Sequence, residues 1–262
     1  MADVASLARL VELGKECGQM ARRLRAEQNR QLKPDGSLVT AADRAIESFL
    51  RIELPRLVPG STVWGEEEGF ESPGQAGLWL VDPVDGTSNY SFGSPLWGVS
   101  IAHYQNGAIT MGCIALPDFD EIYSAGAGKG AYLNGERLSP IPAGPIEPFQ
   151  LLSYDDGFLR DYQHHPIPGK MRYAGAYVVE AAFVFRQSFR GLISYKANLY
   201  DVAASLVIAG ELGAEIRYLD GTRLDLPPII EARCITKPFL IGPAGSGFTL
   251  PFVDRSAKLI KR

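Results

Sequence analysis

Two aspartates, Asp82 and Asp85, stand directly after a short apolar run, Leu78 to Val81, which has the pattern of a buried strand. A proline lies between them and Gly86 follows, so we expect the strand to end at Asp82 in a sharp turn. Two carboxylates beside the backbone amides of Gly86 and Thr87 would form an oxygen-rich cation site next to an anion site. The same residues also make an ordinary surface turn, so this stretch alone leaves both interpretations open.

Other acidic residues have two interpretations as well. The run that begins with Glu66 follows an apolar segment, and it is either a solvated face or the end of a second strand. Asp43 lies three residues after Thr40, where a capping box places an acid at a helix start. Asp201 begins a predicted helix, where it could serve as an N-cap. Each acid, taken alone, has a structural explanation.

The composition excludes several classes of protein. The chain has 262 residues, of which 46% are hydrophobic and 21% charged, as in ordinary globular proteins. With a net charge of -4, the chain lacks the excess of basic residues that is typical of nucleic-acid-binding proteins. No apolar run approaches a membrane span, and the N-terminus lacks the hydrophobic core of a signal peptide. We therefore expect a cytoplasmic protein with no nucleic-acid or membrane partner.

The cysteines and histidines argue against a soft-metal site. Cys17, Cys113 and Cys234 are scattered without paired spacing, which indicates neither a disulfide framework nor a zinc site. Any bound metal would therefore be held by carboxylates, and carboxylates favour a hard cation such as Mg²⁺.

Periodicity and turn residues outline two halves, residues 1–140 and 141–262, with a proline-rich boundary at 140–148. The first half is predicted to contain helices over 2–29 and from Thr40 to a stop at Pro55, strands over 97–104 and 108–116, and a hairpin over 121–138. The second alternates strands over 149–154, 192–195 and 215–219 with helices over 175–187 and 201–212. Residues 126–130 look like part of a P-loop, but Gly130 replaces its Ser or Thr, so we interpret them as a turn.

Together, the acidic stretches resemble the signature blocks of the inositol monophosphatase family. The blocks are Gly65-Glu-Glu, Trp79-Leu-Val-Asp-Pro-Val-Asp-Gly-Thr-Ser-Asn-Tyr90, Tyr200-Asp-Val-Ala-Ala204 and Glu211-Leu-Gly213. Two supporting blocks, Leu38-Val-Thr-Ala-Ala-Asp43 and Gly128-Lys-Gly-Ala-Tyr-Leu-Asn-Gly135, occur in the same order. The resemblance extends from about Lys33 to Leu226 and implies a layered αβαβα sandwich, intermediate between the α+β and α/β classes, as in the inositol monophosphatases and fructose bisphosphatases. The two halves would form one continuous catalytic unit.

The resemblance also assigns roles. It implies two or three Mg²⁺ ions held by Glu66, Asp82, Asp85, Asp201 and the carbonyl of Val84. Thr87 and Asp43 would orient and deprotonate an attacking water, with Glu66 in the same catalytic group and Glu67 as an accessory ligand. The amides of Gly86 and Thr87 would hold the phosphate. The substrate would contact a set made of Asp85, Gly86, Thr87, Gly175, Ala176, Tyr177, Ser194, Lys196 and Asp201.

The reaction implied is direct in-line hydrolysis of a small sugar or polyol phosphate monoester by metal-activated water, in a homodimeric enzyme. Crowding carboxylates is costly without cations, because two of them about 5 Å apart repel by roughly 3 kcal/mol at an effective dielectric of 20.

The substrate segments depart from the family pattern. In Gly175-Ala176-Tyr177, Ala176 replaces the usual Thr or Ser and a bulky ring follows. Ser194 stands where the animal inositol enzymes carry a Glu that binds polyol hydroxyls. Lys196, and less surely Arg190, could attract a second anionic group, which makes fructose 1,6-bisphosphate an alternative substrate. Lys196 could equally be a solvated surface lysine. Histidinol phosphate or a phosphonucleotide is another alternative, and a metal-binding regulatory dimer without turnover is the non-enzyme alternative. Residues 237–262 do not have the pattern of the helix that usually closes this fold.

Overall fold

The computed structural model describes residues 4–27, 30–34, 36–155, 157–158, 165, 167–195 and 197–250. The first half of the chain builds a seven-stranded sheet in the order β3-β4-β5-β6-β7-β8-β9. All neighbours are antiparallel except β3 and β4, which run parallel. The strands are β3 (Thr62–Gly65), β4 (Leu78–Asp85), β5 (Gly98–Gln105), β6 (Ala108–Leu116), β7 (Glu121–Gly126), β8 (Gly130–Leu133) and β9 (Glu136–Arg137).

Strand β4 is longer than the sequence suggested. The prediction that it ends at Asp82 is wrong, because the strand continues to Asp85 with a register shift between Asp82 and Asp85. Pro83 has no N–H to donate to β5, so the ladder is interrupted there and resumes where Asp85 pairs with Gly98. Both carboxylates therefore lie at the interrupted end of the strand.

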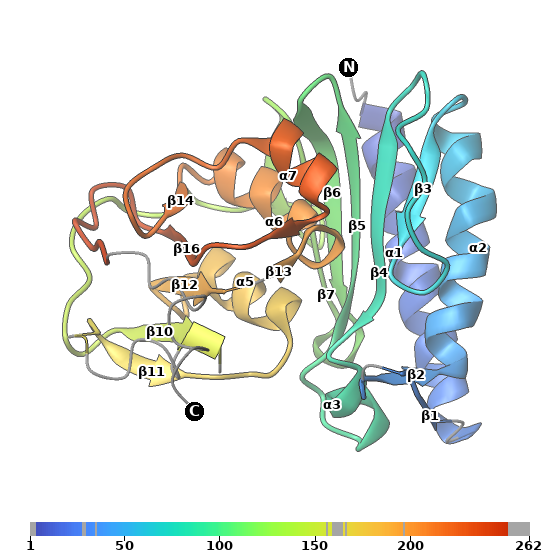
Figure 1. Cartoon of the computed structure of the whole chain (residues 1–262), viewed down its shortest axis with the longest axis horizontal. Coiled ribbons are helices and arrows are strands. Elements are labelled where there is room, and N and C mark those ends of the chain that lie inside the picture. Colours follow the sequence, from blue (N-terminus) through green and yellow to red (C-terminus); the bar gives the residue numbers. More distant parts are fainter. Residues whose placement is uncertain are drawn as a thin grey trace, which may run out of the picture.

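Helices α1 (Val4–Leu24) and α2 (Ala41–Leu57) cover one face of this sheet (Figure 1). The predicted capping box at the start of α2 is confirmed, with Thr40 as N-cap and Asp43 at the third position. The predicted stop at Pro55 is wrong. Pro55 lies in the last turn, where only one helical bond is lost, and the amide of Val58 still bonds the carbonyl of Leu54 at 3.0 Å.

The second half packs on the opposite face of the large sheet. Helices α5 (Tyr177–Phe185) and α6 (Leu199–Glu211) form the next layer, and a five-stranded sheet in the order β11-β10-β12-β16-β14 lies beyond them (Figure 1). Its strands are β10 (Leu151–Tyr154), β11 (Lys170–Arg172), β12 (Gly191–Ser194), β14 (Glu215–Tyr218) and β16 (Phe239–Gly242). The successive layers of helices and sheets confirm the predicted layered fold class.

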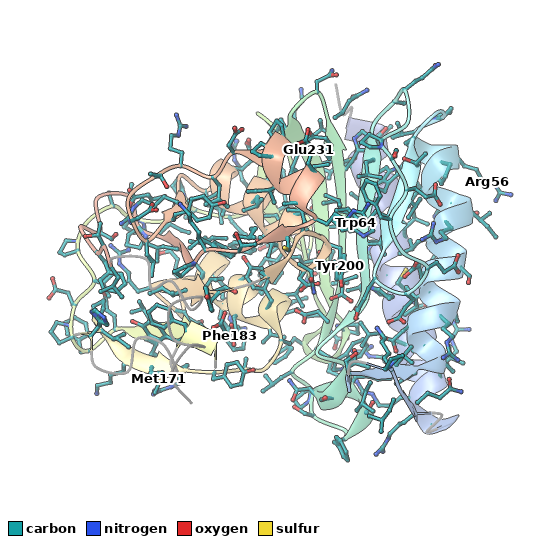
Figure 2. The ribbon with its side chains drawn as sticks, viewed as in Figure 1. Arg56, Trp64, Met171, Phe183, Tyr200 and Glu231 are labelled. Atoms are coloured by element: carbon teal, nitrogen blue, oxygen red, sulfur yellow. The ribbon has the colours of Figure 1, made fainter. Side chains whose placement is uncertain are left out.

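One apolar core joins the large sheet to the layer of α5 and α6. It contains Leu80 and Ile114 from the sheet together with Val178 and Ala203 from the two helices. Trp64, at the end of β3, lies beside Tyr200 of α6, with ring centroids 5.9 Å apart and planes at 90° (Figure 2). This contact joins an element of the first half to one of the second, next to the acidic residues.

Helix α6 begins earlier than predicted. It starts at Leu199 with Asn198 as its N-cap, so Asp201 lies inside the first turn and is not the residue that begins the helix. An acid in the first turn still interacts favourably with the positive end of the helix. Asp201 lines a cavity together with Asp85 of the first half.

Residues 126–130 form a turn, as predicted, and this turn joins β7 to β8. The Glu211 carboxylate accepts hydrogen bonds from the amides of Gly128 and Gly130, both at 2.6 Å, so the chain itself fills this small amide site. The predicted hairpin over 121–138 is a meander of three strands, because Asn134-Gly135 turns β8 into the short β9.

The remaining elements are short. They are η1 (Arg25–Glu27), β1 (Arg30–Leu32), β2 (Leu38–Thr40), α3 (Thr87–Ser91), η2 (Pro117–Phe119), β13 (Ala197–Asn198), α7 (Leu226–Ala232) and β15 (Cys234–Ile235). Residues 243–250 contain no helix, in agreement with the expectation for this stretch; residues 251–262 lie outside the described part. Within the described residues, no helix has both the length and the apolarity to cross a bilayer.

Candidate active site

The acidic residues predicted from the sequence approach one another where three elements meet. β3 and β4 are parallel neighbours, so Glu66 and the pair Asp82 and Asp85 leave the sheet at the same edge. Asp201 reaches this edge from the first turn of α6. The negative charges of Glu66, Asp85 and Asp201 all raise the pKa of Asp82, so we treat the four carboxylates as one acidic cluster.

Burial makes this cluster costly to ionise. Asp82 is 2% exposed, and burial, followed by repulsion from Glu66, Asp201 and Asp85, raises its pKa well above the usual range. Burial also raises the pKa of Asp85 to about 7, and burial together with Asp85 raises the pKa of Asp201. A bound divalent cation would stabilise the ionised form of these acids and so offset the cost of burying them.

Hydrogen bonds fix the two aspartates of β4 in place. The amide of Val84 donates to Asp82 at 3.0 Å, and the amide of Val178, at the start of α5, donates to Asp85 at 2.6 Å. Asp85 is therefore held by both halves of the molecule. Gly86 has a φ of 83°, and a Cβ there would lie 2.7 Å from that of Ala176, so only glycine allows the two halves to approach this closely.

The side chains of Thr87 and Asp43, predicted to act together on water, have separate hydrogen-bond partners. The Thr87 hydroxyl donates to the carbonyl of Val84 at 3.0 Å. Asp43 Oδ2 accepts the amide of Thr40 at 2.8 Å and its hydroxyl at 2.5 Å, while Oδ1 is buried without a partner. Burial raises the pKa of Asp43 to about 6. One carboxylate oxygen thus caps α2, and the other remains available to a ligand.

Lys33 supplies a positive charge at this site. Its ammonium group lies 2.8 Å from Glu66 Oε1 and 2.6 Å from Glu67 Oε1. Burial lowers the pKa of Lys33, but the hydrogen bonds to Glu66 and Glu67 outweigh that effect and raise it above its usual value. The sequence placed Lys33 near Asp43 without predicting this double ion pair.

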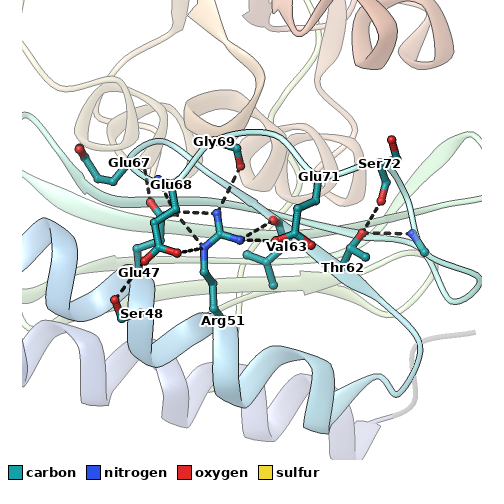
Figure 3. A network of polar contacts seen from close by, with 11 residues as sticks. Glu47, Ser48, Arg51, Thr62, Val63, Glu67, Glu68, Gly69, Glu71 and Ser72 are labelled. Atoms are coloured by element: carbon teal, nitrogen blue, oxygen red, sulfur yellow. Dashed lines mark hydrogen bonds and ion pairs between the residues drawn. The ribbon is translucent and has the colours of Figure 1, made fainter. Parts of the chain in front are cut away.

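Glu47 is a further important residue that the sequence interpretation missed. It is fully buried one turn after Asp43 on α2, and its carboxylate accepts the amides of Glu67 at 2.7 Å and Glu68 at 2.8 Å (Figure 3). Arg51 donates to the same carboxylate at 2.9 Å and to the carbonyl of Gly69 at 3.2 Å. This network fixes the backbone directly after Glu66. The spacing of an acid four residues after Asp43 is the signal that could have found it.

A cavity of about 210 Å³ adjoins the acidic cluster on the side of the second half. The cavity is lined by Gly175, Ala176, Tyr177 and Ser194, together with Asp85 and Asp201, and their role as substrate contacts stays a prediction. The Tyr177 hydroxyl is 3.0 Å from that of Ser205, so it is engaged with α6. Lys196, which was also predicted to contact substrate, lies outside the described residues.

Three residues in or beside this cavity were not predicted. Asp155, after β10, accepts the hydroxyl of Ser194 at 3.0 Å. Glu180 is 4% exposed and accepts the amide of Ala174 at 2.8 Å, and burial raises its pKa to about 7. Asn89 of α3 donates to the carbonyls of Leu96 at 2.7 Å and Ala174 at 2.8 Å, which ties the two halves together. Asp155 and Ser194 are 39 residues apart, and Asn89 and Ala174 are 85 residues apart, so no local pattern marks these two contacts.

The donors of the cluster suit a hard cation. They are carboxylates and a backbone carbonyl, the ligands that Mg²⁺ prefers, and Asp43 adds a buried oxygen without a hydrogen-bond partner. Within the described ranges, no three acidic, histidine or cysteine side chains already converge in ligand geometry. The Lys33 ammonium is paired with Glu66, and the Thr87 hydroxyl donates to the Val84 carbonyl. A metal ion bound to Glu66 and to this carbonyl would replace both contacts.

The layered fold and the acidic cavity at its strand ends are those expected of a phosphoric monoester hydrolase. Comparison with known proteins agrees. The model of the inositol monophosphatase family matches residues 3–237, and the chain belongs to this family, whose members are phosphatases.

Individual relatives support the assignment. The chain is 30% identical over 224 residues to a fructose-1,6-bisphosphatase/inositol-1-monophosphatase of Aquifex aeolicus, covering 81% of this chain and 82% of the relative. It is 32% identical over 237 residues to an inositol-1-monophosphatase of Mesorhizobium japonicum, covering 84% and 88%. The extragenic suppressor protein suhB of Bartonella henselae has the same fold, with a TM-score of 0.78 at 24% identity, covering 91% of this chain and 94% of that one.

Proposed function

We propose that this chain is a Mg²⁺-dependent phosphatase that hydrolyses the phosphate monoester of a small sugar or polyol. The observation that carries the proposal is the cluster of Glu66, Asp82, Asp85 and Asp201, whose burial and mutual repulsion raise the pKa values of the three aspartates. Such a cluster is stable as carboxylates only with cations close by. Family membership supports the phosphatase chemistry.

Glu66, Asp82, Asp85, Asp201 and the Val84 carbonyl would hold two or three Mg²⁺ ions. When bound, the ions neutralise charge on the phosphate and lower the pKa of water. The remaining steps belong to the chain itself. The amides of Gly86 and Thr87, at the start of α3, would bind phosphate oxygens, and Gly86 allows the close backbone approach that this requires.

Asp43 would orient the attacking water and accept its proton. Its Oδ1 is buried without a hydrogen-bond partner, while Oδ2 is anchored by Thr40, so the group is both held in place and available. Burial raises the pKa of Asp43 to about 6, which makes it a better proton acceptor than an exposed aspartate. The Thr87 hydroxyl, now bonded to the Val84 carbonyl, would help to position the same water.

Several wider properties belong to the same proposal. We expect the halves 1–140 and 141–262 to act as one catalytic unit, because Asp85 is held by Val178 and the acids come from both halves. We also expect a homodimer in the cytoplasm with no nucleic-acid or membrane partner. The Aquifex relative, named for both fructose bisphosphate and inositol phosphate, supports a substrate in the sugar or polyol class.

Phosphate release from a substrate panel tests the proposal. The panel contains inositol 1-phosphate, fructose 1,6-bisphosphate, histidinol phosphate and adenosine 3′,5′-bisphosphate, each with and without Mg²⁺. We expect Mg²⁺-dependent release from at least one of them. Silence across the panel, with Mg²⁺ still raising the melting temperature, would contradict the enzyme assignment and favour a metal-binding regulatory dimer.

A further inference from the structure

We propose that Arg25, directly after α1, is a positioning residue for phosphate binding, because it holds α3 and thereby the amides of Gly86 and Thr87 in place. The inference rests on the proposed phosphatase function, in which these two amides bind the phosphate. Arg25 belongs neither to the acidic cluster nor to the signature blocks of the sequence. Its link to the turn before α3 runs through the rings of Tyr90 and Trp97.

Helix α3 depends on other elements for its position. It has five residues, too few for a helix that is stable by itself. The Tyr90 amide donates to the Gly86 carbonyl at 2.9 Å, so a shift of Tyr90 moves Gly86 with it. The placement of the Gly86 and Thr87 amides therefore follows from the side chains that anchor α3.

Side chains of α3 anchor the helix on two sides. Asn89 donates to the Ala174 carbonyl at 2.8 Å, on the side of the second half. Tyr90 is 2% exposed, and its hydroxyl donates to the carbonyl of Ala21, in the last turn of α1, at 2.7 Å. In Figure 1, α3 lies at the lower edge of the molecule, at the end of the sheet where α1 also ends. The end of α1 is thus the support for one side of α3.

Arg25 completes the contact between α1 and α3. Its guanidinium carbon lies 4.8 Å from the ring centroid of Tyr90 and 4.8 Å from that of Trp97. The two rings meet edge to face, with centroids 4.9 Å apart. A cation over an aromatic ring is attracted by the negative face of the ring, and more strongly when water is excluded. Arg25 therefore attracts both rings and holds them against the end of α1.

Asp118 fixes the guanidinium in this position. Arg25 Nη2 donates to Asp118 Oδ2 at 2.8 Å, and the indole N–H of Trp97 donates to the same oxygen at 2.7 Å. The side chains of Arg25 and Asp118 are 26% and 17% exposed, so solvent screens this ion pair only in part. One carboxylate oxygen thus sets the places of both the cation and one of the rings under it.

Other elements hold the proposed metal ligands. Glu66 follows β3, Asp82 lies in β4 and Asp201 lies in α6, and the contacts of Arg25 described above include none of them. A misplacement of about 1 Å in groups that hold a substrate can lower its reactivity about 100-fold, so a small shift of α3 is enough to matter. Loss of the Arg25 guanidinium should therefore weaken phosphate binding and leave the affinity for Mg²⁺ nearly unchanged.

Calorimetric titration of inorganic phosphate into the protein with saturating Mg²⁺ tests the inference, and Mg²⁺ binding is measured separately without phosphate. Arg25→Met keeps the length of the side chain and removes its charge and its donors. We expect the Kd for phosphate to rise about tenfold in this variant, with a change of less than about twofold in the Kd for Mg²⁺. Arg25→Lys keeps a cation near the rings, so its Kd for phosphate should return to within about threefold of the wild type.

Arg9→Met is the matched control, because it makes the same change in α1, where Arg9 pairs with Glu16 and Glu53. Both affinities should stay within about twofold of the wild type in this control. Tyr90→Phe tests the same link with a smaller change and decides the question if Arg25→Met fails to fold. Loss of the hydrogen bond to Ala21 should raise the Kd for phosphate about threefold.

The outcomes separate this inference from the proposed function. An unchanged Kd for phosphate in a folded Arg25→Met protein, or in Tyr90→Phe if Arg25→Met does not fold, would overturn the inference, while the phosphatase function would stand. An equal loss of Mg²⁺ affinity, or an equal effect of Arg9→Met, would also overturn it, because Arg25 would then act through general stability. A wild type that binds no phosphate with Mg²⁺ and releases none from the substrate panel would contradict the proposed function and the inference with it.

Discussion

Asp201 illustrates at the residue scale how a carboxylate that we propose as a metal ligand can oppose folding. Burial and the nearby charges of Asp85 and Glu66 raise its pKa well above the ordinary value. In the protein without metal, the ionised form of Asp201 costs free energy; with cations bound, we expect the same charge to serve as a ligand. Stability and ion binding should therefore respond in opposite directions to its removal.

Asp201→Asn tests this opposition. We expect the melting temperature of the metal-free protein at about pH 8 to rise by roughly 3 °C, because a repulsive charge is removed from a half-buried position. The rise in melting temperature that Mg²⁺ causes in the wild type should be lost. Thermal denaturation with EDTA and with excess Mg²⁺ measures both effects. A metal-free variant less stable than the wild type, with the Mg²⁺ response retained, would contradict the assignment of Asp201 as a ligand.

Lys33→Met tests the role of the ammonium group that bonds Glu66 and Glu67. Removing this cation leaves two carboxylates unbalanced, so the metal-free protein should lose roughly 1 to 3 kcal/mol of stability, and Mg²⁺ should restore more of it than in the wild type. Urea denaturation with and without Mg²⁺ gives both values. Lys15→Met removes an exposed ion pair with Glu12 and serves as the control, for which we expect little change.

The candidate acidic residues could be selected from the sequence, while their catalytic and ligand roles stay predictions. Asp82, Asp85, Asp201 and Glu66 were chosen for their type and their place at the ends of predicted elements, and the structure brings them together. Asp155 was missed because its partner Ser194 is 39 residues away, and only the parallel pairing of β10 with β12 makes them neighbours.

At the element scale, α2 works as a rigid support that carries two carboxylates to the site. Asp43 caps its first turn, and Glu47, one turn later, holds the amides of Glu67 and Glu68. A Cβ at Gly65 would lie 2.2 Å from the Glu47 carboxyl carbon, so the end of β3 rests directly on this group. Glu47 is thus a positioning residue for Glu66.

Glu47→Gln should weaken Mg²⁺ binding without removing a ligand. The amide can accept only one of the two backbone hydrogen bonds through its oxygen, so the backbone after Glu66 loses an anchor. We expect the Mg²⁺ concentration for half-maximal rate to rise about 10- to 100-fold, the usual cost of losing a group that orients a ligand. The same shift should appear in Mg²⁺-dependent melting temperatures.

Glu53→Gln on the same helix is the matched control, because its carboxylate pairs with Arg9 and Arg56 near the surface. An equal effect in both variants would show that Glu47 acts through the general stability of α2. A Glu47→Gln protein with an unchanged Mg²⁺ requirement would contradict its role in positioning Glu66.

The elements themselves were predictable where a local signal exists. The capping box at Thr40 follows from residue type and spacing, and it occurs. The ends of β4 and α2 were misplaced because tertiary pairing with β5 and packing on the sheet carry an element past a proline. Such effects come from neighbours distant in sequence.

At the scale of the whole molecule, the site lies where the large sheet meets the layer of α5 and α6 (Figure 1). Asn89 bonds the Ala174 carbonyl, Val178 bonds Asp85, and Trp64 contacts Tyr200, so each half supports residues of the other. The class of fold could be foreseen from the order of motifs. The close approach at Gly86 could not, because it depends on the shape of both halves together.

The pH dependence of stability is a property of this assembled site. Folded-state pKa values of about 6 for Asp43 and about 7 for Asp85 lie above the ordinary unfolded values. The folded chain therefore binds more protons than the unfolded chain, and its stability falls as the pH rises through this range. We expect the melting temperature of the metal-free protein to fall between about pH 5 and about pH 8.

Saturating Mg²⁺ should reduce that slope, since bound cations stabilise the ionised carboxylates. Melting curves across this pH range, in EDTA and in Mg²⁺, measure the effect. A metal-free protein that becomes more stable as the pH rises would show that the acids are already compensated, contrary to the cluster described here.

The most direct test of the central claim is phosphate release as a function of Mg²⁺ concentration, from the best substrate of the panel, for the wild type and for Asp82→Asn. Asp82 lies at the centre of the acidic cluster, where Glu66, Asp85 and Asp201 all act on it. We predict a rate that rises from the EDTA background to saturation in the wild type, and a rate at least about 100-fold lower in the variant at every Mg²⁺ concentration. Equal rates in the two proteins, or a wild-type rate that is unchanged by EDTA, would contradict the assignment of this cluster as the metal-dependent catalytic site.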